Sequence, residues 1–276
     1  MRDYTEEEQK MLAGMLPNIA LQLRSVMSNL YMAMDSLVPP EKREQDPAVD
    51  RRAAVFCQSY YQLYRVVNNL TEAGRLFEHD RFTLYDGDIV GLCRSVCREV
   101  EFLFELRGVA LEFSADRESR IIGMDGAALR KLMMNLLSNA LKFTPAGGRV
   151  RVRVKADGAS VKIIVSDTGR GMSADRLDHL FDRFLQTDRY DPVPHGLGLG
   201  LGLAICRRVA QGHGGTIVAQ SEEGKGSIFT VSLPAIRAGR VCLHDSGSDY
   251  TGGFNRTLVE LADALGPDAF SHKYLD

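Results

Sequence analysis

Two amides and an ammonium recur at helical spacing in the middle of the chain, in the stretch Asn135-Leu-Leu-Ser-Asn139-Ala-Leu-Lys142. Residues three and four apart lie on one face of a helix, so these three side chains point the same way. An amide oxygen suits Mg²⁺, which prefers oxygen ligands, and a lysine supplies positive charge for phosphate. Taken alone, the pattern is more typical of a solvated polar helix face.

A carboxylate and two glycines follow a stretch typical of a buried strand, in the order Asp167-Thr-Gly169-Arg-Gly171-Met172. A carboxylate at the end of a strand can accept a hydrogen bond from an exocyclic amine such as that of adenine. Glycines permit a positive φ and let a base approach the backbone. Alone, Asp-x-Gly-x-Gly is often only a turn, and its place after a strand favours a nucleotide site.

Two further blocks lie between this cluster and the last third of the chain. Phe181-Asp-Arg-Phe184 is most simply a helix end that packs two aromatic rings, whereas glycine alternates with leucine from Gly196 to Gly202 just before a helix. Such a stretch frees backbone N–H groups to face phosphate, which the helix dipole also attracts. The sequence lacks the P-loop and dinucleotide-fold motifs, as well as zinc-site and Ser-His-Asp signatures.

The four blocks, in this order, resemble the N, G1, F and G2 boxes of the histidine-kinase ATPase domain of the GHKL superfamily, and the resemblance covers about residues 82–234. It implies that the chain binds ATP or ADP with Mg²⁺. Asn139 would hold the metal, Asn135 and Lys142 would lie by the phosphates, and Asp167 would recognise adenine. The implied nucleotide-binding residues are Asn135, Asn139, Lys142, Asp167, Gly169, Gly171, Met172, Phe184, Gly198, Leu199, Gly200, Leu201 and Gly202.

One position separates branches of this superfamily. Its hydrolysing members resemble one another in placing a glutamate where this chain has Asn135. An amide cannot accept a proton from water as a carboxylate can, so efficient ATP hydrolysis is not expected.

Two amphipathic helices precede the ATP-binding region. Apolar residues keep a spacing of three and four from Leu12 to Leu37 and again from Val49 to Phe77, while Pro39-Pro40 and a charged stretch between them predict a loop. This pattern predicts an antiparallel helical hairpin. A lone hairpin has too little core, so we expect a homodimer through residues 5–80, in which two hairpins form a four-helix bundle.

The first helix resembles the dimerisation and phosphoacceptor helix of histidine kinases over residues 15–26. The matching residues are Asn18, Ile19, Leu23 and Arg24. The phosphoacceptor histidine falls on Leu21 and its acidic neighbour on Gln22. Leucine has no nucleophile with which to attack a γ-phosphate, so the usual self-transfer is excluded. The stripe that contains Leu21 is otherwise small or polar, which predicts that it faces outward.

Helices and strands mix beyond about residue 82. We expect helices over 88–107, 125–141 and 203–211, and strands over 109–114, 149–155, 161–165, 216–220 and 227–233. This order predicts an α/β sandwich with a largely antiparallel sheet, and hence an α+β chain. The expected units are the hairpin (1–81), the ATP-binding domain (82–236) and a C-terminal extension (237–276), which contains a short helix and has no predictable role.

The composition restricts the partners and the location. Of 276 residues, 45% are hydrophobic and 25% are charged, with a net charge of −2, so neither nucleic acid nor an anionic membrane is an expected partner. No apolar run approaches the ~20 residues of a membrane span. Five cysteines without a CxxC pair fit a reducing compartment, which predicts a cytoplasmic location.

The sequence therefore predicts a Mg-ATP-binding, histidine-kinase-like protein of two-component signal transduction. It would act as a regulatory pseudokinase whose partners are a second copy and a response regulator or partner kinase. The alternative is an active kinase that phosphorylates a relocated histidine, such as His79, or a histidine of a partner. A chaperone- or repair-type ATPase of the same superfamily is disfavoured by Asn135 and by the hairpin.

Overall fold

The structure is a computed structural model, and it describes residues 6–78, 82–178, 180–181, 200–240 and 254–275. Its helices are α1 (Glu6–Leu37), α2 (Pro40–Gln45), α3 (Pro47–Glu78), α4 (Ile89–Leu106), α5 (Gly126–Phe143), α6 (Ala174–Asp178), α7 (Leu201–Gly212), α8 (Arg256–Leu261), the 3₁₀ helix η1 (Pro267–Phe270) and α9 (His272–Leu275). Its strands are β1 (Tyr85–Asp88), β2 (Ala110–Ala115), β3 (Ile121–Met124), β4 (Arg149–Ala156), β5 (Ser160–Asp167), β6 (Thr216–Glu222) and β7 (Gly226–Pro234).

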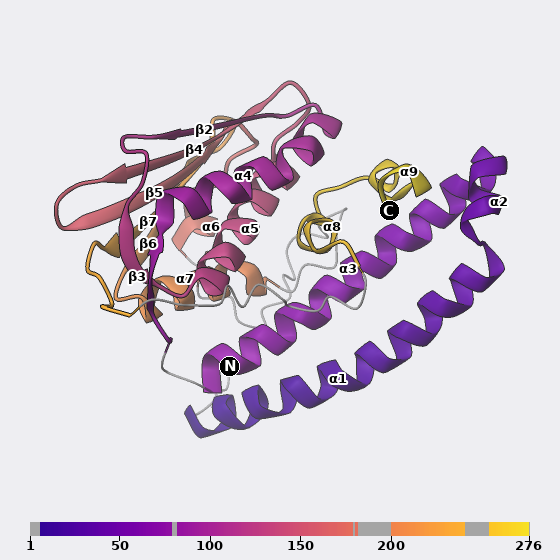
Figure 1. The fold of residues 1–276 in the computed structure, drawn as a ribbon, viewed down its shortest axis with the longest axis horizontal. Helices are drawn as coiled ribbons and strands as arrows, with labels where there is room; N and C mark the ends of the chain where they lie inside the picture. Colours follow the sequence, from indigo (N-terminus) through magenta and orange to yellow (C-terminus); the bar gives the residue numbers. More distant parts are fainter. Residues whose placement is uncertain (1–5, 79–81, 179, 182–199, 241–253, 276) are drawn as a thin grey trace.

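The two long helices, α1 and α3, pack against each other as a hairpin that projects beside the rest of the molecule (Figure 1). The predicted loop between them is wrong, because it contains the short helix α2. Pro40 lies in the first turn of α2, where its fixed φ suits a helix and its missing N–H is not needed. The α2 helix is anchored by buried Arg43, whose Nε lies 2.8 Å from Oδ1 of Asp50 on α3.

The α1 helix uses only one of its apolar stripes to contact α3. Ala20 and Met27 are buried in that contact, together with half-buried Tyr31. The stripe that the 3–4 spacing picked out is exposed instead, since Val26 is 58% and Leu30 is 52% exposed. We call this exposed stripe the open face of α1, and its described members are Ile19, Leu23, Val26, Leu30 and Leu37.

A five-stranded sheet forms the second part of the molecule, with the strand order β2-β4-β5-β7-β6. β2 runs parallel to β4, and the other neighbours are antiparallel, which confirms the predicted mixed α/β layer with a largely antiparallel sheet. The alternation of arginine and valine in β4 buries Val150, Val152 and Val154. Helices α4, α5 and α7 cover that apolar face (Figure 1).

Three short elements between residues 82 and 236 were not predicted, nor were η1 and α9 near the C-terminus. β1 and β3 form a separate two-stranded antiparallel ladder, and α6 is a helix of five residues. β1 reads Tyr-Asp-Gly-Asp, which has no apolar alternation, so its sequence carries no strand signal.

The C-terminal segment, which we define as residues 254–275, lies between α3 and α5 (Figure 1). Its first helix, α8, is the short helix expected from the sequence. Leu258, Leu261 and Phe270 are buried, so the segment is part of the core. Among the helices that the structure describes, none is long and apolar enough to cross a membrane.

Candidate functional site

Helix α5 presents the amide face. The helix starts cleanly, because the side chain of Asp125 accepts a hydrogen bond from the backbone N–H of Ala128 and so caps the first turn. Asn135 is buried, and its Nδ2 lies 3.4 Å from the carbonyl oxygen of Gly202, to which it donates. In the described part of the chain its Oδ1 has no hydrogen-bond partner although it is buried. Buried acceptors in folded proteins are satisfied by protein groups, water, ions or ligands, so this oxygen is free to accept a hydrogen bond from one of these.

The other two members of that face, Asn139 and Lys142, are half-buried. The Lys142 ammonium lies 5.7 Å from the centroid of the Phe143 ring. Burial lowers the pKa of Lys142, and the charge of Asp263 acts in the opposite direction. Asn135, Asn139 and Lys142 all lie in α5 at spacings of four and three residues, so they share one face of the helix, as predicted.

Asp167 ends β5, and its carboxylate organises the turn that follows. Oδ1 accepts hydrogen bonds from the backbone N–H of Gly169 at 2.9 Å and of Ser227 at 3.2 Å. Both bonds end on the same oxygen, so Oδ2 takes no part in them. Burial raises the pKa of Asp167 above its ordinary value, whereas the two backbone donors lower it.

Close backbone packing explains the glycines after Asp167. A Cβ on Gly169 would lie 2.4 Å from the carbonyl oxygen of Phe143, at the end of α5. Gly171 has φ +66°, and a Cβ there would lie 2.0 Å from the carbonyl oxygen of Glu222. These contacts bring the end of α5, the turn after β5 and the β6–β7 turn into one place.

Met172 is fixed by a serine that sequence reasoning missed. Its backbone N–H donates to Oγ of Ser221 at 2.9 Å, and that hydroxyl donates to the carbonyl oxygen of Gly226 at 2.9 Å. Ser221 ends β6 in a turn-rich stretch, where a polar residue carries no signal of its own. Only the register of β6 against β7 places it beside Met172.

The glycine-rich stretch enters the described part of the chain at Gly200. This residue has φ +68° and precedes α7, and Leu201 is buried. Gly202 faces the amide of Asn135, since a Cβ on it would lie 3.3 Å from Oδ1. Phe184, Gly198 and Leu199 lie outside the described residues, as do residues 185–193, which the family resemblance gives as the lid over ATP.

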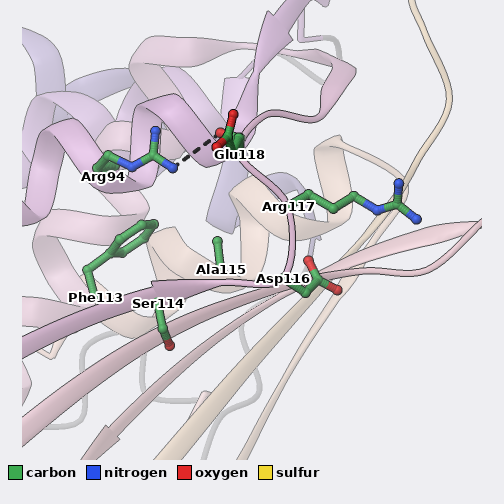
Figure 2. A pocket seen from close by; sticks show the side chains of 7 residues that line it. All are labelled: Arg94, Phe113, Ser114, Ala115, Asp116, Arg117 and Glu118. Carbon is green, nitrogen blue, oxygen red and sulfur yellow. Dashed lines mark hydrogen bonds between the residues drawn. The ribbon is translucent and has the colours of Figure 1, made fainter.

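A separate shallow pocket of about 340 Å³ lies between α4 and the end of β2. In Figure 2, Arg94 reaches the carbonyl oxygen of Glu118, to which it donates at 3.2 Å, and its guanidinium lies 5.6 Å from the centroid of the Phe113 ring. The pocket shares no residue with the site predicted from the sequence.

The comparisons with known proteins agree with this geometry. Residues 124–237 match the family model described as histidine kinase-, DNA gyrase B-, and HSP90-like ATPase. This stretch is therefore similar to an ATPase domain of that family, and we call it the ATPase domain. The domain contains α5, Asp167 and α7, and so all the described groups of the candidate site.

The chain resembles proteins that are named as sensory kinases or as sensor proteins. The adaptive-response sensory kinase SasA of Synechococcus sp. (strain JA-2-3B'a(2-13)) is 29% identical over 244 residues, which are 86% of this chain and 62% of SasA. The sensor protein DivL of Caulobacter vibrioides is 39% identical over 130 residues, which are 47% of this chain and 16% of DivL. The chain thus spans less than two thirds of the length of these relatives.

Solved structures extend the likeness beyond the ATPase domain. The crystal structure of full-length ShkA in complex with AMPPNP has a TM-score of 0.63 at 28% identity, over 79% of this chain and 45% of that one. Histidine kinase ThkA, crystallised with the response regulator protein TrrA, has a TM-score of 0.56 at 18% identity, over 87% of this chain and 70% of that one. At that identity the second likeness concerns the fold alone.

Proposed function

We propose that the chain is a Mg-ATP-binding, histidine-kinase-like protein of two-component signalling that acts as a regulatory pseudokinase. The observation that carries the nucleotide site is the buried, unpartnered Oδ1 of Asn135 beside the backbone of Gly202. Asp167 lies at the other end, on the turn that packs against the end of α5. The AMPPNP complex of the similar ShkA structure supports nucleotide binding at a domain of this fold.

Each polar group has a defined part in this proposal. The Asn139 amide would be the protein ligand of Mg²⁺, since amide oxygens suit a hard cation that keeps several of its waters. Asn135 and Lys142 would contact the phosphates, and the Asp167 carboxylate would accept from the amino group of adenine. Without a carboxylate at position 135, no side chain there can take a proton from water, which favours holding ATP over hydrolysing it.

The pseudokinase assignment rests on Leu21. Its side chain is 66% exposed on α1, and Gln22 beside it is also exposed, so the position matched to the phosphoacceptor faces outward. A hydrocarbon side chain offers no lone pair to the γ-phosphate, and an amide cannot serve as the base. ATP held by the ATPase domain would then act as a regulatory ligand.

We also propose a homodimer through the hairpins. The open face of α1 is a continuous apolar stripe that α3 of the same chain leaves uncovered. A second copy of the stripe would cover it around a twofold axis and complete a four-helix bundle. A response regulator or a partner kinase would be the further partner, a class supported by the sensor-kinase relatives and by the ThkA complex with TrrA.

The nucleotide site is tested by calorimetry with Mg-ATP and Mg-ADP. Asn139→Ala should weaken binding of both nucleotides in the presence of Mg²⁺, and Asp167→Ala should weaken adenine recognition by roughly 1–3 kcal/mol, the cost of an unmatched polar contact. Ser160→Ala, on the far end of β5, is the matched control. Unchanged affinity in both site variants would refute the assignment.

Transfer is tested with γ-labelled ATP. The wild-type protein alone should acquire no acid-labile label. The double variant Leu21→His with Gln22→Glu should become labelled if the ATPase domain is competent, while Ser25→His, at another exposed position of α1, should not. Acid-labile label on the wild-type chain at any of its histidines would favour the alternative, an active kinase with a relocated acceptor.

A further inference from the structure

The C-terminal segment lies between the hairpin and the ATPase domain and contacts both (Figure 1). Phe254 meets a cluster of aromatic rings on α1 and α3, including Tyr31 at 4.7 Å and Tyr60 at 5.3 Å between centroids. Phe270 is fully buried, 5.2 Å from the ring of Tyr61. The segment is therefore held by packing at both of its ends.

Polar contacts join the segment to α3 along its whole length. Gln58 donates to the carbonyl oxygen of Leu265 at 2.8 Å, and Arg43 of α2 donates to that of Phe270 at 2.9 Å. Further along α3, Nη1 of Arg65 lies 2.8 Å from Oδ2 of Asp263, and both side chains are largely buried. The hairpin thus holds the segment through a buried ion pair as well as through apolar contacts.

A second buried ion pair joins the segment to the ATPase domain. Nζ of Lys131, on α5, lies 2.8 Å and 2.6 Å from the two carboxylate oxygens of Glu260. Burial alone would raise the pKa of Glu260, but the charges of Lys131, Arg65 and Arg256 lower it below its ordinary value. Glu260 is therefore ionised at neutral pH. Its partner Lys131 lies one helical turn before Asn135 on the same face of α5.

Two acidic residues of the segment are paired with buried cations. Lys131 of α5, one helical turn before Asn135, pairs with Glu260, and Arg65 of α3 pairs with Asp263. One oxygen of that second carboxylate, Oδ1 of Asp263, is buried and has no hydrogen-bond partner in the described residues. Burial lowers the pKa of Lys142, the lysine expected to contact phosphate, and the charge of Asp263 raises it. The segment thus brings two carboxylates to the place where it packs against α5 and α3.

We propose that residues 254–275 are an autoinhibitory clamp, whose Glu260 and Asp263 neutralise Lys131 of α5 and Arg65 of α3 while the segment fixes the hairpin against the ATPase domain. This inference rests on the proposed nucleotide site. The phosphates of ATP are alike in charge to the two carboxylates and would lie against the same helix, α5, so each disfavours the other. By linkage, a clamp that weakens triphosphate binding is itself loosened by triphosphate to the same extent.

The competition is electrostatic, so its size follows the charge of the nucleotide. ATP should be disfavoured more than ADP, and adenosine least. Loosening the segment would free α3, and with it the hairpin, to move relative to the ATPase domain. Nucleotide binding would then be read out as a change in the placement of the hairpin, which requires no phosphate transfer.

The test is calorimetry on the full chain with Mg-ATP, Mg-ADP and adenosine. Asp263→Asn removes one clamp carboxylate and keeps its shape, and it should tighten ATP binding about tenfold and ADP binding less, within the usual range of coupling between sites. Asp268→Asn makes the same change at an exposed position of η1 in the same segment and should leave every affinity unchanged. Hydrogen exchange of wild-type residues 254–275 should rise with Mg-ATP and much less with adenosine.

The outcomes separate the clamp from the nucleotide site. Equal ATP affinity of the wild type and Asp263→Asn, together with exchange in the segment that Mg-ATP leaves unchanged, would overturn the clamp and leave the nucleotide site standing. No binding by any of the three proteins would overturn both. If Asp263→Asn fails to fold, the wild-type exchange measurement decides the matter alone, because it needs no substitution.

Discussion

Helices α1 and α3 have the same length, 32 residues each, and both carry apolar residues at helical spacing, yet their surroundings differ. The α1 helix is covered on one side only and keeps its open face exposed. The α3 helix is covered on two sides, by α1 and by the C-terminal segment with α7. Apolar periodicity thus predicts that a helix buries one face. Whether that face packs against a distant part of the same chain or is left for another copy depends on the fold.

The strongest test of this contrast is to remove a matched apolar side chain from each environment. Phe270→Ala should lower the free energy of unfolding by about 3–5 kcal/mol, because it empties a fully buried site between the segment and α3. Met32→Ala on α1, where the side chain is 64% exposed, should change it by less than about 0.5 kcal/mol. Denaturant unfolding measures both, and equal losses would mean that the segment does not cover α3 in solution.

The buried ion pair gives the next largest effect. Glu260→Gln should cost about 3 kcal/mol in unfolding free energy, because the Lys131 ammonium stays buried without its counterion. The control is Glu112→Gln, whose exposed carboxylate pairs with Arg151 on the surface of the sheet and should leave the unfolding midpoint almost unchanged. A Glu260→Gln variant as stable as the wild type would show that the pair does not hold the segment.

The open face of α1 is tested by its effect on association. Val26→Lys should raise the dissociation constant of the dimer about 100-fold, since a twofold interface contains the substitution twice and each charge disfavours burial. Leu21→Lys adds the same charge on α1 outside the open face and should leave association unchanged. Light scattering over a concentration series distinguishes the two, and a wild-type monomer at every concentration would refute the dimer.

The smallest expected effect is the change in unfolding free energy that follows from protonation of Glu260, which occurs only in acid. Its folded pKa lies below the unfolded value, so its stabilisation is complete above about pH 4.5 and is lost as the pH falls through the folded pKa. The difference in unfolding free energy between the wild type and Glu260→Gln should therefore be constant from neutral pH down to about 4.5 and shrink below it. A difference that shrinks already near pH 7 would contradict the lowered pKa.

Local chemistry made much of the fold predictable. The Arg-Val alternation of β4 gave a strand with one buried face, and the four ordered blocks gave the ATPase domain with its amide-bearing helix. Asn135 and Gly202 were both named from the sequence, and the structure brings them into contact. The assignment of these residues to ATP and Mg²⁺ stays a prediction.

The rest was hidden because it depends on contacts between distant residues. Nothing local distinguishes Arg65 or Lys131 from the solvated charges of any amphipathic helix, and each is buried in an ion pair with the distant C-terminal segment. Ser221 has the same status, since only the β6–β7 register gives it a partner. The sequence predicted a helix in the C-terminal segment but not where it packs. Apolar spacing indicates that a helix buries one face, and it does not indicate against which element.

The contact between Arg65 and Asp263 joins residues that are 198 positions apart. A ribosome that adds about 5–20 residues per second makes the second partner roughly 10–40 s after the first. During that interval the side of α3 that the C-terminal segment covers stays without that cover. In the proposed dimer, which uses the open face of α1, two hairpins translated side by side would be able to pair before the segment is made, so association would precede the docking of the segment on α3.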